Sequence, residues 1–182
     1  MSTGYTLMAR VLTGSRLYGY HTDTSDYDYI EIWKDPIESL IGFNPVMKTK
    51  QLIRDDGTDV TQYGLRHFIS LALDGNPNIL DILFSHIWYY NTGEWLQIYE
   101  SRQCFISQRA AAKFRGYAIS AEHQYKKKRD IKDYIASYRM RANLHHLSST
   151  GRHNPQLLPS TANYLRARNK RNNRSLTIPT IY

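Results

Sequence analysis

Two aspartates alternate with tyrosines in a segment that is typical of a β-strand. Residues 27–33, YDYIEIW, are rich in aromatic and β-branched side chains and are bounded by turn-forming residues. On an extended chain, Asp26 and Asp28 point to the same face with their Cα atoms about 6.6 Å apart. Like charges repel there and strands are depleted in aspartate, so this placement is unfavourable unless a divalent cation compensates. The pair therefore predicts a strand at a metal site.

Other short strands are expected around this one. Residues 7–13, LMARVLT, predict a buried strand that stops at the turn Gly14-Ser15. Residues 46–53 predict another strand, and after a break the chain returns in extended form at residues 58–60. The segment between Gly14-Ser15 and the paired aspartates has room for one short turn of helix.

Beyond residue 60 the hydrophobic period becomes helical. Apolar side chains at i, i+3, i+4 and i+7 predict a helix over 61–74, and Asn76 is expected to cap a second helix that starts at Pro77. Further helices are expected from about residue 92, over about 104–127 and over about 130–147. The predicted fold class is therefore α/β (α+β), with a small mixed sheet followed by a helical region.

Composition suggests three parts along the chain. Residues 1–90 are expected to form the core that carries the paired aspartates, and residues 91–147 a helical region. Residues 148–182 are rich in Ser, Asn, Arg and Pro and contain few apolar side chains. We therefore expect the last part to be a basic, flexible tail or extended arm.

The net charge of +8 is unevenly distributed. Residues 1–101 hold 7 Lys/Arg and 13 Asp/Glu, whereas residues 102–182 hold 17 Lys/Arg and 3 Asp/Glu. The second half is therefore expected to attract phosphate groups, either of RNA or of another polyanion. The alternative is a solvated basic helical face that binds nothing.

A turn and a third aspartate accompany the paired aspartates. The Gly14-Ser15 turn follows a strand and offers backbone N–H groups and a hydroxyl to a phosphate. Asp59 lies in a neighbouring predicted strand and can supply a third oxygen ligand. Each element alone also occurs in ordinary turns and solvated strand edges, so the prediction depends on their order and spacing together.

The string GSRLYGYHTDTSDYDYIEIW resembles the nucleotidyltransferase signature of the DNA polymerase β superfamily. The later string DVTQYGLRHFISLALDGNPNILDILF is similar to a subgroup of small bacterial and phage "predicted nucleotidyltransferases". The resemblance covers about residues 8–120. It implies that Asp26, Asp28 and Asp59 are catalytic and bind two divalent cations, Mg²⁺ or Mn²⁺.

The same resemblance implies the nucleotide contacts. Gly14 and Ser15 are expected to hold the triphosphate, with Arg16 and Ser25 beside them, although Arg16 is equally well explained as a surface arginine. On a later helix the subgroup tends to have a lysine and a histidine. Arg141 and His145 stand at that spacing here, which makes them candidate phosphate or acceptor contacts.

The function predicted from these features is metal-dependent transfer of a nucleoside monophosphate from a nucleoside triphosphate, such as ATP, to a hydroxyl acceptor, with RNA or tRNA as the leading candidate. Two alternatives remain: a nucleotide- or nucleic-acid-binding module without turnover, and a metal-dependent phosphoester hydrolase.

No apolar run is long enough to span a membrane and Cys104 is the only cysteine, so we expect a soluble, cytoplasmic protein.

Overall fold

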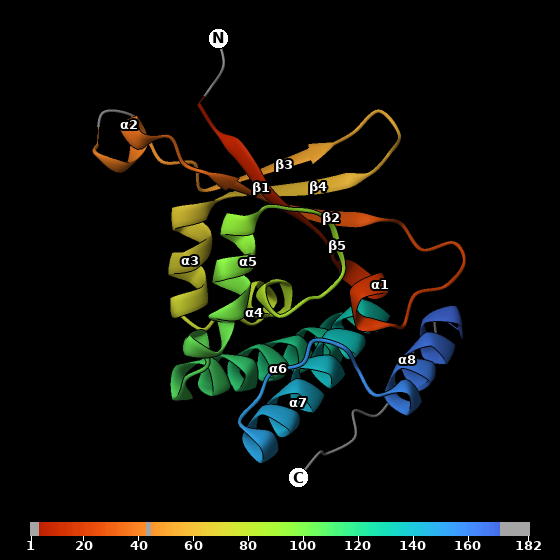
Figure 1. The fold of residues 1–182 in the computed structure, drawn as a ribbon. Helices are drawn as coiled ribbons and strands as arrows, with labels where there is room; N and C mark the ends of the chain where they lie inside the picture. The colour runs from red at the N-terminus through yellow and green to blue at the C-terminus, as the bar shows by residue number, and fades with distance from the viewer. Residues whose placement is uncertain (1–3, 43–44, 172–182) are drawn as a thin grey trace.

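The computed structural model describes residues 4–42 and 45–171. Five strands form one mixed sheet in the order β3-β4-β2-β1-β5, in which β2 and β4 are parallel and the other neighbours are antiparallel (Figure 1). The strands are β1 (Thr6–Leu12), β2 (Asp28–Lys34), β3 (Thr49–Ile53), β4 (Asp59–Gly64) and β5 (Trp88–Asn91). The mixed sheet of the predicted fold class is confirmed.

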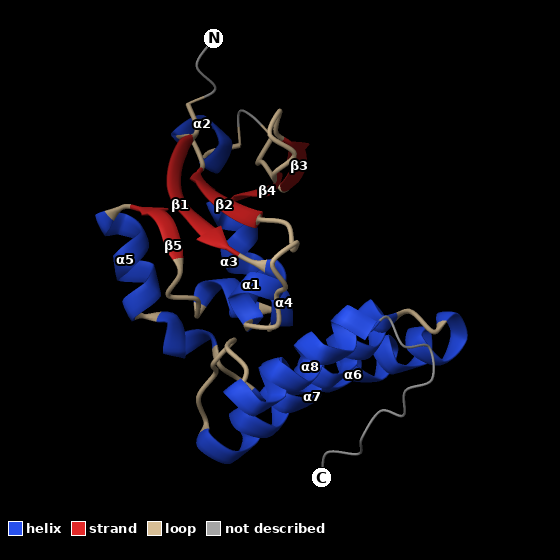
Figure 2. Ribbon diagram, turned by 90° about the vertical axis from the view of Figure 1, so that its right-hand side faces the viewer, coloured by secondary structure: helices blue, strands red, loops and turns tan. Residues whose placement is uncertain are grey.

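Helices stack below this sheet in two layers (Figure 1). α3, α4 and α5 lie next to the sheet, and α6, α7 and α8 lie side by side beyond α4 (Figure 2). The helices are α1 (Gly14–Tyr18), α2 (Ile37–Leu40), α3 (Leu65–Leu73), α4 (Pro77–Leu83), α5 (Gly93–Glu100), the 3₁₀-helix η1 (Arg102–Phe105), α6 (Gln108–Lys128), α7 (Ile131–Thr150) and α8 (Pro159–Arg171).

The main core lies between the sheet and the helices. Val11 of β1, Phe68 of α3 and Trp95 of α5 are fully buried, and Phe114 extends this core into the second helical layer. The apolar faces predicted for the helices after residue 60 are thus the faces that pack. A smaller cluster around Leu165 holds α6, α7 and α8 together.

Local capping signals correctly located two helix starts. The Asn76 side chain accepts hydrogen bonds from the backbone N–H groups of Asn78 and Ile79, as expected for a cap of α4. Thr92 caps α5 in the same way by accepting from the N–H of Trp95. These side chains satisfy donors that the first helical turn leaves unpaired.

One prediction about this region was wrong, and one strand was missed. The helix expected over 61–74 begins only at Leu65, because residues 61–64 continue β4 beside β2. β5 was not predicted at all, although Trp88, Tyr89 and Tyr90 are aromatic residues that favour strands. In both cases pairing with a strand distant in the sequence decides the backbone conformation.

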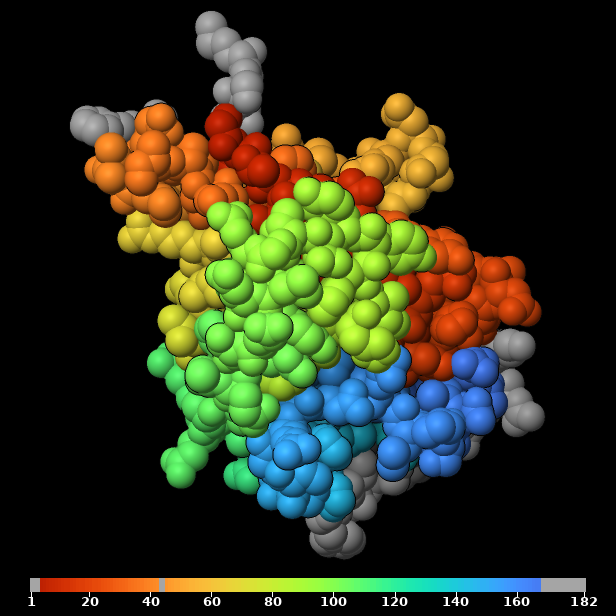
Figure 3. Space-filling model, viewed as in Figure 1, coloured from red at the N-terminus to blue at the C-terminus, as the bar shows by residue number. Residues whose placement is uncertain are grey.

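The expected flexible tail is also wrong as far as residue 171. α7 continues to Thr150, His153 is 6% exposed, and Leu165 of α8 is completely buried. α8 packs beside the segment that follows the first strand (Figure 3), where the Arg166 Nη2 donates to the carbonyl of Gly19 at 2.6 Å. A few well-spaced apolar side chains are enough to dock this helix. The remainder of the predicted tail, residues 172–182, lies outside the described residues.

The outer face of β2 carries a buried carboxylate. Glu31 alternates with the core residue Ile32 and therefore points away from the helices. It is fully buried and accepts hydrogen bonds from Arg10 at 2.6 Å, Arg54 at 2.8 Å and Gln62 at 2.8 Å. These polar contacts join β1, β2 and β4 across the sheet.

None of the helices in the described part of the chain is both long and apolar enough to cross a membrane.

Candidate active site

The three predicted aspartates lie at one edge of the sheet. Asp28 is the first residue of β2 and Asp59 the first residue of β4, and the parallel register places them opposite each other. Adjacent strands are about 4.8 Å apart, so the two residues are immediate neighbours. Asp26 lies just before β2, in the loop that follows α1, and its side chain is exposed. The structure therefore brings the carboxylate-bearing residues together, although Asp26 is not part of the strand itself.

These carboxylates repel one another. Burial raises the pKa of Asp28 above its usual value, and the charges of Asp59 and Asp26 raise it further. Lys132, at the start of α7, acts in the opposite direction. The edge is therefore an electrostatically unfavourable group of acids, with one basic side chain from the helical layer nearby. Within residues 4–42 and 45–171, no three His, Cys, Asp or Glu side chains are arranged as a ready metal-ligand group.

Gly14 packs directly against Asp28. Its φ is +67°, a conformation that residues with a Cβ adopt only with strain, and a Cβ here would collide with the Asp28 Oδ2 atom. The N–H of Thr13 donates to the carbonyl of Asp28 at 2.9 Å. The predicted phosphate turn is thus held against the start of β2, and Ser15 follows it in α1.

Arg16 and Ser25, predicted to contact the nucleotide, make hydrogen bonds within the loop before β2. The Arg16 guanidinium donates to the carbonyls of Ser25 at 2.7 Å and Asp26 at 3.2 Å, and it stacks on the Tyr27 ring at 3.7 Å. The Ser25 Oγ accepts from the N–H of Thr22 at 2.9 Å. Both side chains therefore shape the loop that carries Asp26.

Arg141 and His145 lie elsewhere. Both line a cavity between α6 and α7, and Arg141 pairs with Glu122 of α6. Arg141 is nine residues beyond Lys132, a distance of about 13 Å along a helix. The side chain of α7 that acts electrostatically on Asp28 is instead Lys132, which the sequence analysis did not single out. Its only signal was its position next to the basic run at the end of α6.

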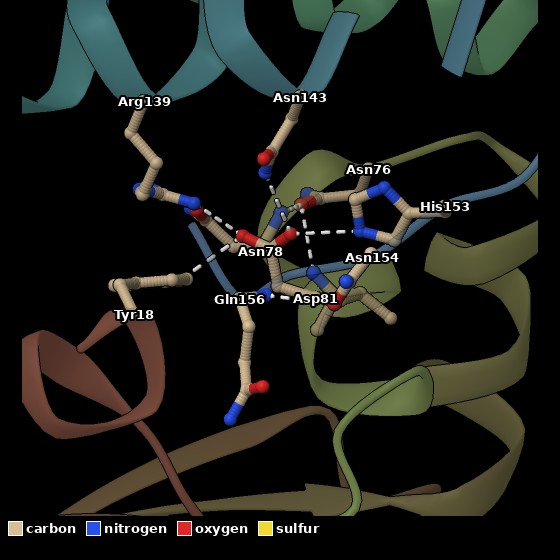
Figure 4. A network of polar contacts seen from close by, with 10 residues as sticks. Tyr18, Asn76, Asn78, Asp81, Arg139, Asn143, His153, Asn154 and Gln156 are labelled. Atoms are coloured by element: carbon tan, nitrogen blue, oxygen red, sulfur yellow. Dashed lines mark hydrogen bonds and ion pairs between the residues drawn. The ribbon is translucent and has the colours of Figure 1, made fainter. Parts of the chain in front are cut away.

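A second feature missed from the sequence is a buried polar network around Asp81 (Figure 4). Asp81 of α4 is fully buried and forms an ion pair with Arg139 of α7, which is 6% exposed. It accepts a hydrogen bond from the Tyr18 hydroxyl at 3.0 Å, and the His153 Nε2 lies 2.9 Å from its Oδ1. Asn143 completes the set with a longer contact of 3.4 Å.

This network connects α1 to the helical layers. Tyr18 is the last residue of α1, the helix that begins at Gly14, and the Arg139 guanidinium lies 3.9 Å above its ring. Burial raises the pKa of the Tyr18 hydroxyl well above its usual value, so it remains a neutral donor to Asp81. An aspartate within the apolar run NILDIL was the one sequence signal that could have pointed to this network.

Together, these features define a class of protein. A small mixed sheet with aspartates at the starts of two neighbouring strands, beside a Gly-Ser turn that opens a helix, is the arrangement of a polymerase-β-type nucleotidyltransferase. Residues 2–176 match the sequence profile of RlaP, described as the RNA repair pathway DNA polymerase beta family. Because the match covers nearly the whole chain, the protein belongs to this family.

Two further similarities are more limited. The chain is 35% identical over 77 residues to an uncharacterized 38.9 kDa protein of Enterobacteria phage T4, which is 38% of this chain and 23% of the phage protein. A nucleotidyltransferase-like protein from Exiguobacterium sibiricum has a similar structure with a TM-score of 0.39 and 8% identity, over 89% of this chain and 60% of the other. The chain thus spans less than two thirds of either protein.

Proposed function

We propose that this protein transfers a nucleoside monophosphate from a nucleoside triphosphate to a hydroxyl group of RNA, with the help of two divalent cations, Mg²⁺ or Mn²⁺. The main support is the register pair of Asp28 and Asp59 at the sheet edge beside Gly14, in a chain of a polymerase-β-type family. The family description supports RNA as the acceptor, and so does the strong positive charge of residues 102–182.

The aspartates fit divalent cations in their chemistry. Mg²⁺ and Mn²⁺ prefer oxygen ligands. Burial raises the pKa of Asp28, and repulsion from Asp59 and Asp26 raises it further; a bound cation would offset both effects. Asp26, Asp28 and Asp59 would hold the two ions. When bound, such ions stabilise the charge on the attacking and leaving oxygens of a phosphoryl transfer.

The chain's own groups have separate tasks in this proposal. The backbone N–H groups at Gly14 and the Ser15 hydroxyl hold the triphosphate, and the Lys132 ammonium neutralises part of its charge. An Asp59 carboxylate oxygen accepts the proton of the attacking hydroxyl, whose oxygen bonds to the α-phosphate while the bond to the β-phosphate breaks and pyrophosphate leaves. Arg16 and Ser25 support the site by fixing the loop that carries Asp26.

Transfer of label from each α-labelled nucleoside triphosphate to RNA, with Mg²⁺ or Mn²⁺ present, tests the proposal. We expect labelled RNA with the unmodified protein and a loss of at least about 100-fold with Asp59→Asn, because proton acceptance contributes that much or more. Asp55→Asn is the matched control, since Asp55 is an exposed aspartate in the β3–β4 connection that leads to Asp59. It should retain activity.

Three results would contradict the proposal. Free nucleoside monophosphate without labelled RNA would indicate a hydrolase. Nucleotide binding without any product, under either metal, would indicate a binding module. Equal loss of activity in Asp59→Asn and Asp55→Asn would mean that position 59 has no special part in the reaction.

A further inference from the structure

A cavity of about 400 Å³ lies between α6 and α7, away from the aspartates. Its lining combines two kinds of side chain. Arg115, Arg141 and His145 are basic, whereas Ile119 and Leu144 form an apolar wall. Ile119 is 46% exposed, so this wall faces solvent. The arrangement at the sheet edge does not account for this cavity, and its lining includes Arg141 and His145, which were predicted as phosphate or acceptor contacts.

The positive charge at the cavity is only partly neutralised. Glu122 is shared between two cations, Arg141 and Lys126, the latter at 2.6 Å. Within the residues that the structure describes, no carboxylate forms an ion pair with Arg115. Glu122 thus balances at most one of the two arginines that line the cavity, and the cavity retains a positive charge that suits an anion.

The combination of an apolar wall and basic side chains suits a phosphorylated nucleoside. Ligand cavities of this size are mainly apolar, with a few polar groups that fix the orientation. A base and ribose can pack against Ile119 and Leu144, and the guanidinium groups of Arg115 and Arg141 match the geometry of a phosphate. His145 adds a hydrogen-bonding group at the edge.

The position of the cavity indicates whether it would take the triphosphate substrate or a nucleotide of the RNA strand. Arg141 lies about 13 Å along α7 from Lys132, so a ligand here does not occupy the position of the triphosphate beside Asp28. The cavity is, however, in the same helical layer that carries most of the excess positive charge. A polynucleotide that extends from the sheet edge along this layer meets the cavity.

We propose that the cavity between α6 and α7 binds one nucleotide of the acceptor RNA strand, at a distance from the reacting end. The proposal depends on the proposed function, because it takes RNA as the acceptor. It adds a specific place where the strand is held in addition to the catalytic edge.

Fluorescence anisotropy of a short labelled single-stranded RNA with the full chain tests this. Arg115→Gln removes one cation of the cavity, and Lys127→Gln is the matched control because it removes an exposed cation from the same helix outside the cavity. We expect Arg115→Gln to weaken binding about tenfold, since a hydrogen bond to a charged group has that effect. The slope of log affinity against log salt should also fall by about 0.7.

A second variant tests whether RNA enters the cavity itself, without a change in the cavity's charge. Ser148→Trp places a large side chain at the exposed edge of the cavity, and it should weaken RNA binding without changing the slope against salt. Equal weakening by Arg115→Gln and Lys127→Gln would overturn the proposal, because it would indicate diffuse attraction. Unchanged binding in Ser148→Trp would also overturn it.

Competition distinguishes other occupants. If free AMP or UMP occupies the cavity as tightly as RNA does, the site binds free nucleotides and the proposal fails. If polyglutamate binds with the same dependence on Arg115, the site serves an acidic protein and the proposal also fails. If unlabelled RNA displaces the labelled RNA and neither free nucleotides nor polyglutamate do, the result supports the proposal.

The two proposals can fail separately. RNA binding that depends on Arg115 in a protein that transfers no nucleotide would retain the cavity and remove the proposed function. Transfer to RNA with equal binding by Arg115→Gln and Lys127→Gln would do the reverse. Asp28→Asn should bind RNA through the cavity while losing transfer.

Discussion

Asp81→Asn should be the most destabilising conservative substitution in this protein. It leaves the shape of the side chain unchanged but removes the counter-charge of Arg139, which is buried beside it. Removal of one partner from a buried ion pair costs about 3–5 kcal/mol, because the other charge remains desolvated and unpaired. Tyr18 and His153 lose their shared carboxylate acceptor at the same time.

For a chain of this size, 1 kcal/mol corresponds to about 2–4 °C in Tm, so we expect a decrease of roughly 6–20 °C. Thermal and urea unfolding followed by circular dichroism measure it. Asp74→Asn is the control, since Asp74 pairs with Arg109 and Lys113 at the surface, where solvent screening leaves such pairs little effect on stability. A change in Asp81→Asn no larger than in Asp74→Asn would refute the reasoning.

Three further predictions concern β2 and the glycine that packs against it. Gly14→Ala should lower the unfolding free energy by about 1–2 kcal/mol, because alanine is strained at the positive φ of this position. It should also abolish nucleotide transfer, because the added Cβ collides with Asp28; transfer at the wild-type rate would refute the packing argument. Asp28→Asn should be more stable than the wild type at pH 7 in urea unfolding, because the raised pKa of Asp28 means that the wild type loses stability as the pH rises through that pKa. The difference between the two proteins should disappear below about pH 3.9, the usual pKa of aspartate. Although burial raises the pKa of Glu31, hydrogen bonds from Gln62 and Arg10 lower it more. The stability that Glu31 contributes is therefore present above about pH 4.3 and is lost on acidification. Urea unfolding of Glu31→Gln should show a smaller loss of unfolding free energy at acid pH than the wild type does, and an unchanged acid response would contradict this.

The parts of the fold that were correctly predicted from sequence are those with local causes. The strand before Gly14 and the cap at Asn76 depend on neighbouring residues, and both occur as expected. β5 and the strand conformation of residues 61–64 depend on partners far along the chain, so local period alone could not find them. The same limit explains α8, which is stabilised by burial of Leu165 against other helices.

The candidate site shows a similar division. Asp28, Asp59 and Gly14 were identified because their residue types and spacing resemble a known signature, and the register places them together. Asp81 was not identified from the sequence, because its partners Arg139 and His153 are 58 and 72 residues away along the chain. A buried charged residue can be recognised from the sequence only when the residues that pair with it are known.

The buried network explains how so short a helix can carry the phosphate turn. α1 has only five residues, and an isolated helix of that length is unstable because nucleation costs more than its few hydrogen bonds return. Its end is instead held from the helical layers, by Asp81 at Tyr18 and by Arg166 at the carbonyl of Gly19. Since α4, α7 and α8 all contribute to this support, the helical layers fix the Gly14-Ser15 turn relative to the cavity that we propose holds RNA.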